Sequence, residues 1–107
     1  SVSPTETVGA ALELMNAHAV TQIPVLEDNK SVGSLRESYV LAKIIADKNV
    51  MNSTVGEVME ESFPVVDVDT SLARIKTKLQ KSPAVLIEDF KRITGIITRS
   101  DVLELLN

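Results

Sequence analysis

The chain contains no cysteine and no tryptophan, and only three of its 107 residues are aromatic: Tyr39, Phe63 and Phe90. Without cysteine there can be no disulfide framework, no thiolate metal site and no cysteine nucleophile. With so few aromatic residues, the hydrophobic core has to be built from Val, Ile, Leu and Ala side chains. A chain without disulfides is expected in the cytoplasm.

Positive charge and long apolar runs are also scarce. Eleven Lys and Arg residues stand against fifteen Asp and Glu, so the formal net charge is −4. Nucleic acids and anionic membranes attract basic surfaces, so this balance argues against both as partners. No apolar run approaches the ~20 residues of a membrane span, and no signal peptide opens the chain. The abrupt start at Ser1, without Met, suggests a fragment of a longer protein.

The main positive feature is an internal duplication. Val2 pairs with Val66 in the second half, an offset of 64 residues, and the same offset relates Val8 to Leu72. Later in the unit the offset becomes 62, because Gly33 pairs with Gly95. The second copy is therefore two residues shorter between its first helix and the next strand. A period this long indicates an old duplication of one small unit and not a solenoid repeat.

The apolar patterns predict the order strand, helix, strand, strand, helix in each copy. In the first copy, Val8, Ala11, Leu12 and Met15 have helical spacing, residues 23–26 and 32–35 read as strands, and Asp28–Lys30 supplies a turn. The residues predicted to line the inner face of the following helix are Val40, Leu41, Ile44 and Ile45. In the second copy the strands are expected at 64–66, 84–87 and 93–98, and the helices at 72–79 and from Ser100 onward.

These elements predict an α/β (α+β) fold made of two β-α-β-β-α units related by a pseudo-two-fold axis. The first repeat covers residues 1–47, a connector with one short helical turn at Thr54–Glu57 covers 48–59, and the second repeat covers 60–107. Each repeat is too short for an independent core. We therefore expect the two to pack together through their sheets, with a cleft along the seam.

The two copies differ in one polar motif. The second copy reads Gly95-Ile96-Ile97-Thr98-Arg99-Ser100-Asp101, whereas the first has Arg36 in place of the Thr98 hydroxyl and Tyr39 in place of the Asp101 carboxylate. Gly95 would allow close packing or a bulge. One polar site kept and one altered favours a binding module over an enzyme. No combination of nucleophile, base and orienting group is present, and no cluster of metal ligands.

With these residues laid out, the whole chain resembles a tandem pair of CBS domains, also called a Bateman module. The most specific element is the Gly-hydrophobic-hydrophobic-Thr-x-x-Asp motif from Gly95 to Asp101. Four further stretches resemble the C-terminal regulatory module of the cystathionine beta-synthase family: 20–25, 32–38, 55–59 and 83–87. The resemblance implies a homodimer and a parent that carries a pyridoxal-phosphate-dependent catalytic domain, none of which lies within this chain.

The resemblance also implies a site for an adenosyl ligand, either S-adenosylmethionine or AMP, ADP or ATP. The corner after the last strand would hold the ribose, and the segment before and at Pro24 would meet the adenine. The residues implied are Val20, Thr21, Gln22, Ile23, Pro24, Ile96, Ile97, Thr98, Ser100 and Asp101. The sequence departs from the pattern of the animal enzymes at Val20, which is small where a larger aromatic residue is usual, so stacking on the base is not expected.

Each of these residues also has a structural interpretation. Thr-x-x-Asp at the start of an apolar helix is a capping signature, so Thr98 and Asp101 either cap the last helix or bind a ribose. Gln22 either bonds the adenine edge or caps a strand in solvent. Arg36 and Tyr39 are expected to fill space, although Arg36 could reach a phosphate. Three hypotheses follow: a regulatory adenosyl-binding module of a cystathionine beta-synthase-like enzyme, a ligand-free module that sets the oligomeric state, or a CBS pair that regulates another enzyme or a transporter.

Overall fold

The computed structural model describes residues 1–106, with side chains as far as Leu103, and the chain divides into two compact units. Unit 1 runs from Ser1 to Ser62 and unit 2 begins at Phe63. Among the described residues, no helix combines the length and the apolar character that crossing a bilayer requires.

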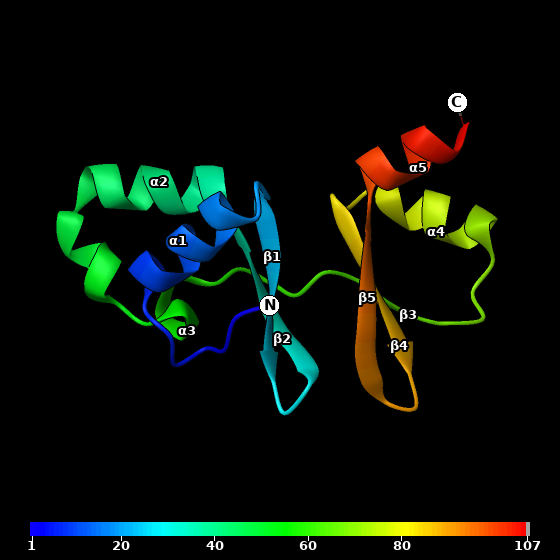
Figure 1. Ribbon diagram of the computed structural model, residues 1–107, viewed down its shortest axis with the longest axis horizontal. Helices are drawn as coiled ribbons and strands as arrows, with labels where there is room; N and C mark the ends of the chain where they lie inside the picture. Colours follow the sequence, from blue (N-terminus) through cyan, green and yellow to red (C-terminus); the bar gives the residue numbers. More distant parts are fainter. Residues whose placement is uncertain (107) are drawn as a thin grey trace. The chain divides into compact units, whose positions relative to one another are not determined.

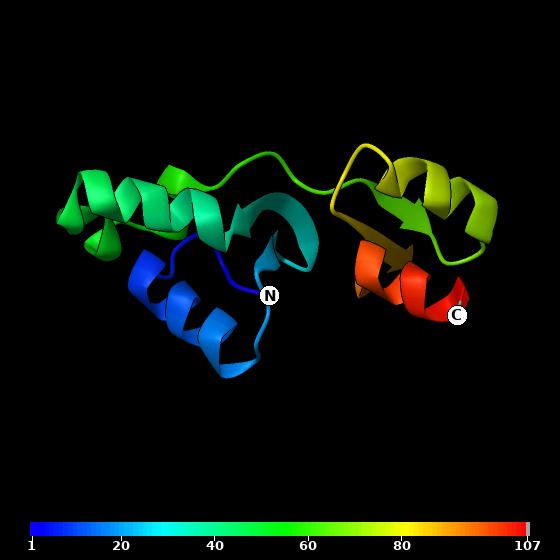
Figure 2. The ribbon, with the colours of Figure 1, turned by 90° about the horizontal axis from the view of Figure 1, so that it is seen from above.

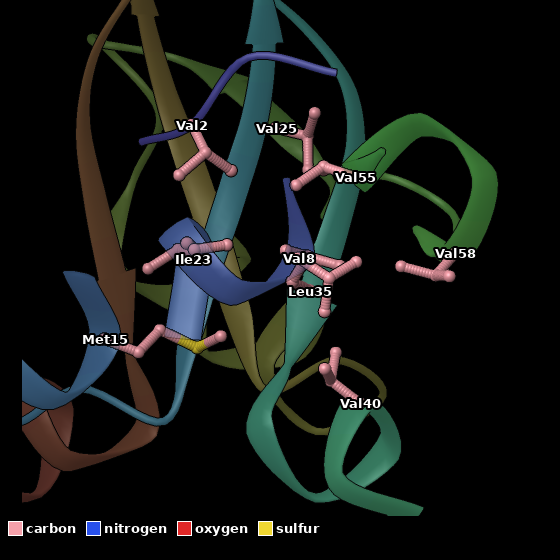
Figure 3. Packing of buried hydrophobic residues seen from close by; sticks show 10 residues of the cluster. Val2, Val8, Met15, Ile23, Val25, Leu35, Val40, Val55 and Val58 are labelled. Carbon is pink, nitrogen blue, oxygen red and sulfur yellow. The ribbon is translucent and has the colours of Figure 1, made fainter. Parts of the chain in front are cut away.

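Unit 1 is a small sheet with helices packed on one face (Figures 1 and 2). Its elements are α1 (Val8–Ala17), β1 (Gln22–Glu27), β2 (Lys30–Arg36), α2 (Glu37–Ala46), the 3-10 helix η1 (Lys48–Asn52) and α3 (Val55–Val58). β1 and β2 pair as an antiparallel hairpin, and the strand expected at the start of the chain is a single parallel bridge from Val2 to Val25. The core is entirely aliphatic apart from Met15, as Figure 3 shows.

Unit 2 repeats this plan with a three-stranded sheet. Its elements are β3 (Val65–Asp67), α4 (Leu72–Leu79), β4 (Ala84–Asp89), β5 (Arg92–Thr98) and α5 (Arg99–Leu106). β3 is parallel to β4, and β4 is antiparallel to β5. One sheet face packs with α4 and α5 through Val66, Ile75, Leu79, Val85 and Val102, whereas Phe63 packs with Ala84 and Leu86 on the other.

The two units also share the same irregularities of the backbone at equivalent positions. The register of β1 and β2 shifts between Val25 and Leu26, and that of β4 and β5 shifts between Ile87 and Glu88, an offset of 62. Both hairpins turn through two residues with positive φ. α1 has 10 residues and α4 has 8, which accounts for the two-residue difference between the copies.

One prediction about α2 is wrong. Val40 is fully buried and Ile44 packs against the core, but Leu41 is 43% exposed and Ile45 is 86% exposed. Successive helical residues are about 100° apart, so these two residues form a stripe next to the one that Val40 and Ile44 occupy. The narrow sheet of unit 1 covers only one of the two stripes.

The free edge of β2 is covered by the segment that follows α3. Ser34 and Glu60 exchange backbone hydrogen bonds of 3.0 and 2.9 Å, and the Ser34 hydroxyl donates to the Glu61 carbonyl at 2.6 Å. Gly33 makes this approach possible, since a Cβ on Gly33 would lie 2.5 Å from Met59 Sδ and 3.0 Å from the Glu60 carbonyl oxygen. Glu60 therefore covers this edge of the unit 1 sheet through an isolated antiparallel bridge.

A matched pair of substitutions tests this close approach. Gly33→Ala is expected to lower the free energy of unfolding by about 1–3 kcal/mol, because Met59 and the Glu60 backbone have to move. Gly95→Ala, the corresponding change in unit 2, is expected to leave it unchanged or slightly higher, since its nearest neighbour is Ile87 Cβ at 3.9 Å and no glycine has positive φ. Urea unfolding of both variants measures the difference, and equal losses would contradict the role assigned to Gly33.

Candidate functional site

The Gly95–Asp101 motif forms a corner at which β5 becomes α5 with no intervening loop. Thr98 is the residue before the helix, and Asp101 lies in its first turn. The Asp101 carboxylate, through Oδ2, accepts from the Thr98 backbone amide at 2.8 Å and from the Thr98 hydroxyl at 3.1 Å. The Asp101 amide in turn donates to Thr98 Oγ1 at 3.4 Å. This reciprocal arrangement is a capping box.

The capping box leaves part of the carboxylate available. Oδ2 makes both side-chain bonds, whereas Oδ1 makes none among the residues that the structure describes. Asp101 is exposed, and its charge lies in the first turn of α5, where the helix dipole favours an anion. The corner therefore presents a fixed acceptor at the surface. Capping and ligand binding, the two interpretations of this motif, are compatible.

The predicted residues next to this corner lie on opposite faces of β5, because side chains alternate along a strand. Ile97 is half-buried and packs into the core with α4 and α5, whereas Ile96 is 38% exposed on the other face. Ser100 is exposed. Ile96 and Thr98, two residues apart, lie on the same face of β5, so an apolar side chain adjoins the polar corner.

The corresponding corner of unit 1 has different chemistry. α2 follows β2 directly, but Arg36, at the position of Thr98, makes no side-chain cap. Its guanidinium donates from Nε to Glu60 Oε1 at 2.9 Å and from Nη2 to Oε2 at 2.6 Å. The hydrogen bond to Glu60, together with the attraction of its charge, raises the pKa of Arg36 above its ordinary value. Tyr39, at the position of Asp101, has Lys43 Nζ 5.0 Å from its ring centre.

These contacts support the interpretation of Arg36 and Tyr39 as structural residues. A guanidinium that already holds a carboxylate by two hydrogen bonds has to lose that partner before it can bind a phosphate. The Arg36–Glu60 pair was not foreseen, because Glu60 is 24 residues away and nothing in the local pattern joins the two.

The predicted segment Val20–Pro24 lies in unit 1, between α1 and the body of β1. Ala19 has positive φ (52°), and the Val20 amide donates back to the Met15 carbonyl, which ends α1 in a tight turn. Val20 is 38% exposed, and Thr21 is exposed with its carbonyl accepting from the Glu37 amide. Ile23 is buried in the core, so it can offer a ligand its backbone only.

Other polar residues have structural roles. Asp67 Oδ1 accepts from the Asp69 amide at 3.3 Å in the turn before α4, and His18 ends α1. In the described part of the chain, no three carboxylate or imidazole groups are arranged to hold a metal ion.

A groove between α4 and α5 was not predicted. Its volume is about 300 Å³, and the residues that line it are Lys76, Leu79, Gln80, Arg99, Val102 and Leu103. The Arg99 Nε donates to the Leu79 carbonyl at 2.6 Å, which ties the two helices together at one end.

Comparison with known proteins identifies the family. The family model for the CBS domain matches residues 1–46 and 55–107. The chain belongs to the CBS-domain family. It is a tandem CBS pair and not a catalytic fold, and CBS domains are regulatory ligand-binding modules.

Individual relatives agree with this assignment. The CBS pair is 28% identical to cystathionine beta-synthase of Dictyostelium discoideum over 99% of the chain and 22% of that enzyme. It is 27% identical to inosine-5'-monophosphate dehydrogenase of Methanocaldococcus jannaschii over 97% of the chain and 21% of that enzyme. The chain thus spans about a fifth of the length of these curated relatives.

Among solved structures, a hypothetical conserved protein from Geobacillus kaustophilus is 28% identical, with a TM-score of 0.85 over 99% of this chain and 85% of that one. A CBS domain-containing protein of unknown function from Bacillus anthracis is 25% identical, with a TM-score of 0.87 over 99% and 82%.

The capping box can be tested with two threonines that precede helices. Thr98→Ala removes a side-chain cap and is expected to lower the free energy of unfolding by about 1 kcal/mol. Thr54→Ala is the control, because Thr54 makes no cap bond; the first amides of α3 donate instead to the Glu6 and Pro4 carbonyls. Thermal unfolding compares them, and an equal loss in both variants would show that the Thr98 cap contributes nothing.

Proposed function

We propose that this CBS pair senses an adenosine-containing ligand, S-adenosylmethionine or an AMP-like nucleotide, and thereby controls an attached cystathionine beta-synthase-like catalytic domain. The observation that carries the proposal is the asymmetry between the corners. Unit 2 keeps a surface carboxylate with an unused oxygen at Asp101, whereas unit 1 has Tyr39 at that position and a paired Arg36.

The chemistry of the unit 2 corner suits a ribose. An ionised carboxylate accepts hydrogen bonds from two adjacent hydroxyls, and charge-assisted bonds contribute roughly 1.5–3 kcal/mol each. In the proposal, Asp101 Oδ1 accepts from the ribose, Thr98 and Ser100 lie beside it, and Ile96 covers the sugar ring. The N-terminus of α5 favours a phosphate or carboxylate group of the ligand.

The adenine is assigned to the segment Val20–Pro24. Val20 provides apolar surface, and exposed Thr21 and half-buried Gln22 provide polar groups of the kind that an adenine edge requires. Val20 is too small to stack on the base, so hydrogen bonds and the apolar lining have to supply the selectivity. The net charge of −4 favours the cationic sulfonium of S-adenosylmethionine over the polyanion ATP, with AMP as the next candidate.

The proposed partners follow from the family. CBS domains often dimerise, and we propose a homodimer in the cytoplasm, attached to a pyridoxal-phosphate-dependent catalytic domain. The similarity to a cystathionine beta-synthase supports this parent, and the similarity to an inosine-5'-monophosphate dehydrogenase supports the alternative that the module regulates another enzyme. Ligand binding would change catalytic output through a coupling free energy that is typically 1–3 kcal/mol.

One observation favours a second function, a ligand-free module that sets oligomeric state. The capping box gives Thr98 and Asp101 a structural purpose without any ligand. The two functions differ in what they require of Asp101, since capping needs one acceptor oxygen and ribose binding needs a charged group with a second.

A thermal-shift panel tests the proposed function. It contains S-adenosylmethionine, S-adenosylhomocysteine, AMP, ADP and ATP. A ligand at 100 times its Kd is expected to stabilise the fold by roughly 2.7 kcal/mol, which in a domain of this size raises the melting temperature by more than about 5 °C. No shift with any of the five would favour the ligand-free module.

Substitutions at the two corners test the proposed site. Asp101→Asn keeps one carbonyl oxygen for the cap but loses the charge and one acceptor. We expect it to weaken ligand binding at least tenfold while the melting temperature without ligand changes little. Tyr39→Ala, the matched position of unit 1, is expected to leave the ligand-induced shift unchanged. Isothermal titration measures both, and the reverse pattern would place the ligand in the other corner.

A further inference from the structure

The tip of the β4–β5 hairpin is occupied by residues that its backbone does not favour. Phe90 and Lys91 have φ of 49° and 63°, almost the values of Asp28 and Asn29 at the tip of the β1–β2 hairpin, 51° and 63°. Asp and Asn adopt this left-handed conformation readily, whereas a bulky aromatic residue there is an outlier. Unit 1 therefore shows which residues the turn requires, and Phe90 is not one of them.

The Phe90 side chain is also exposed to solvent. Its side chain is 91% exposed, whereas Phe63 is 5% exposed in the core and Tyr39 lies beneath Lys43. Phe90 thus combines an unfavourable backbone conformation with an aromatic ring in water, and neither is offset inside unit 2. An outlier of this kind indicates a role outside the fold.

The groove between α4 and α5 has the properties that an exposed aromatic ring requires of a binding site. It is apolar inside, with Leu79, Val102 and Leu103, and its volume of about 300 Å³ exceeds the about 150 Å³ that accepts a benzene-sized group. Lys76 and Arg99 supply positive charge at its border. Neither forms an ion pair within the part of the chain that the structure describes.

Phe90 cannot fill the groove of its own unit. On α5 the groove is lined by Arg99, Val102 and Leu103, in the first residues after β5. Figure 1 shows the tip of the β4–β5 hairpin at the opposite end of β5 from α5. Between them β5 runs from Arg92 to Thr98, a length of about 20 Å at 3.3 Å per residue. A contact between the two features has to join two molecules.

Charge favours one orientation of such a contact. Glu88 and Asp89 precede Phe90 on β4, and among the described residues neither forms an ion pair. Beside a groove bordered by Lys76 and Arg99 these carboxylates are attracted, whereas Lys91 and Arg92, which follow Phe90, are repelled. The β4 side of the tip therefore faces the border of the groove.

We propose that Phe90 of one copy inserts into the α4–α5 groove of a second copy. Each copy carries one tip and one groove, so two copies satisfy both contacts by reciprocal insertion about a two-fold axis, the commonest symmetry of homodimers. The inference names the contact of the homodimer proposed above and does not depend on the adenosyl ligand.

Sedimentation equilibrium of the full chain, from low micromolar to several hundred micromolar, tests the contact. The chain is expected to dimerise, and Phe90→Asn, which copies the residue type of the unit 1 tip, is expected to raise the dimer Kd at least about tenfold without lowering the melting temperature. Leu103→Gln, at a residue 62% exposed, is expected to do the same from the side of the groove. Leu41→Gln is the control, at the corresponding exposed position of α2, and is expected to leave the Kd unchanged.

Mixing identifies the pairing. Phe90→Asn keeps its groove and Leu103→Gln keeps its tip, so an equimolar mixture is expected to form a one-to-one complex that neither variant forms alone. A dimer unaffected by Phe90→Asn would overturn the contact but leave the homodimer standing. A chain that stays monomeric throughout would overturn both. A fall in melting temperature on Phe90→Asn would show that the ring is covered within its own chain and would overturn the proposal.

Discussion

A two-stranded hairpin is too small to be stable alone, and unit 1 depends on what covers the two edges of its sheet. Val2 bridges to β1 on one side, and Glu60 bridges to β2 on the other. The second edge has consequences beyond stability. Because the Ser34–Glu60 bridge fixes Glu60 beside the end of β2, its carboxylate meets Arg36. The backbone pairing that completes the sheet thus also determines which carboxylate Arg36 binds at the corner of unit 1.

The two corners follow from the same geometric demand. A strand that becomes a helix without a loop leaves the first helical amides to be satisfied by whatever stands at the junction. Unit 2 uses the Thr98 and Asp101 side chains. Unit 1 has no side-chain cap at this junction, and the Glu37 amide donates to the Thr21 carbonyl. The Arg36 side chain takes no part in capping α2 and pairs with Glu60.

Local pattern predicted most of the fold, since the order of the elements, the hairpin turns and the change of offset within the repeat all depend on neighbours in sequence. What it missed was set by contacts between distant segments. The exposure of Leu41 and Ile45 depends on the width of the sheet under α2, and the need for Gly33 depends on Met59. At the candidate site, the Thr98–Asp101 spacing indicated a cap or a ligand group. Only the three-dimensional arrangement shows that one carboxylate oxygen of Asp101 suffices for the cap.

The capping box also affects the entropy of any later binding event. A surface aspartate normally samples several rotamers, and immobilising a side chain at an interface costs about 0.5–1.5 kcal/mol. Asp101 has already lost that freedom on folding, because Oδ2 is held at 2.8 and 3.1 Å by two groups of Thr98. A ligand that approached Oδ1 would meet a carboxylate already fixed in one orientation. The helix cap would then preorganise the Asp101 side chain for binding, because the side chain loses its conformational entropy during folding and not on binding.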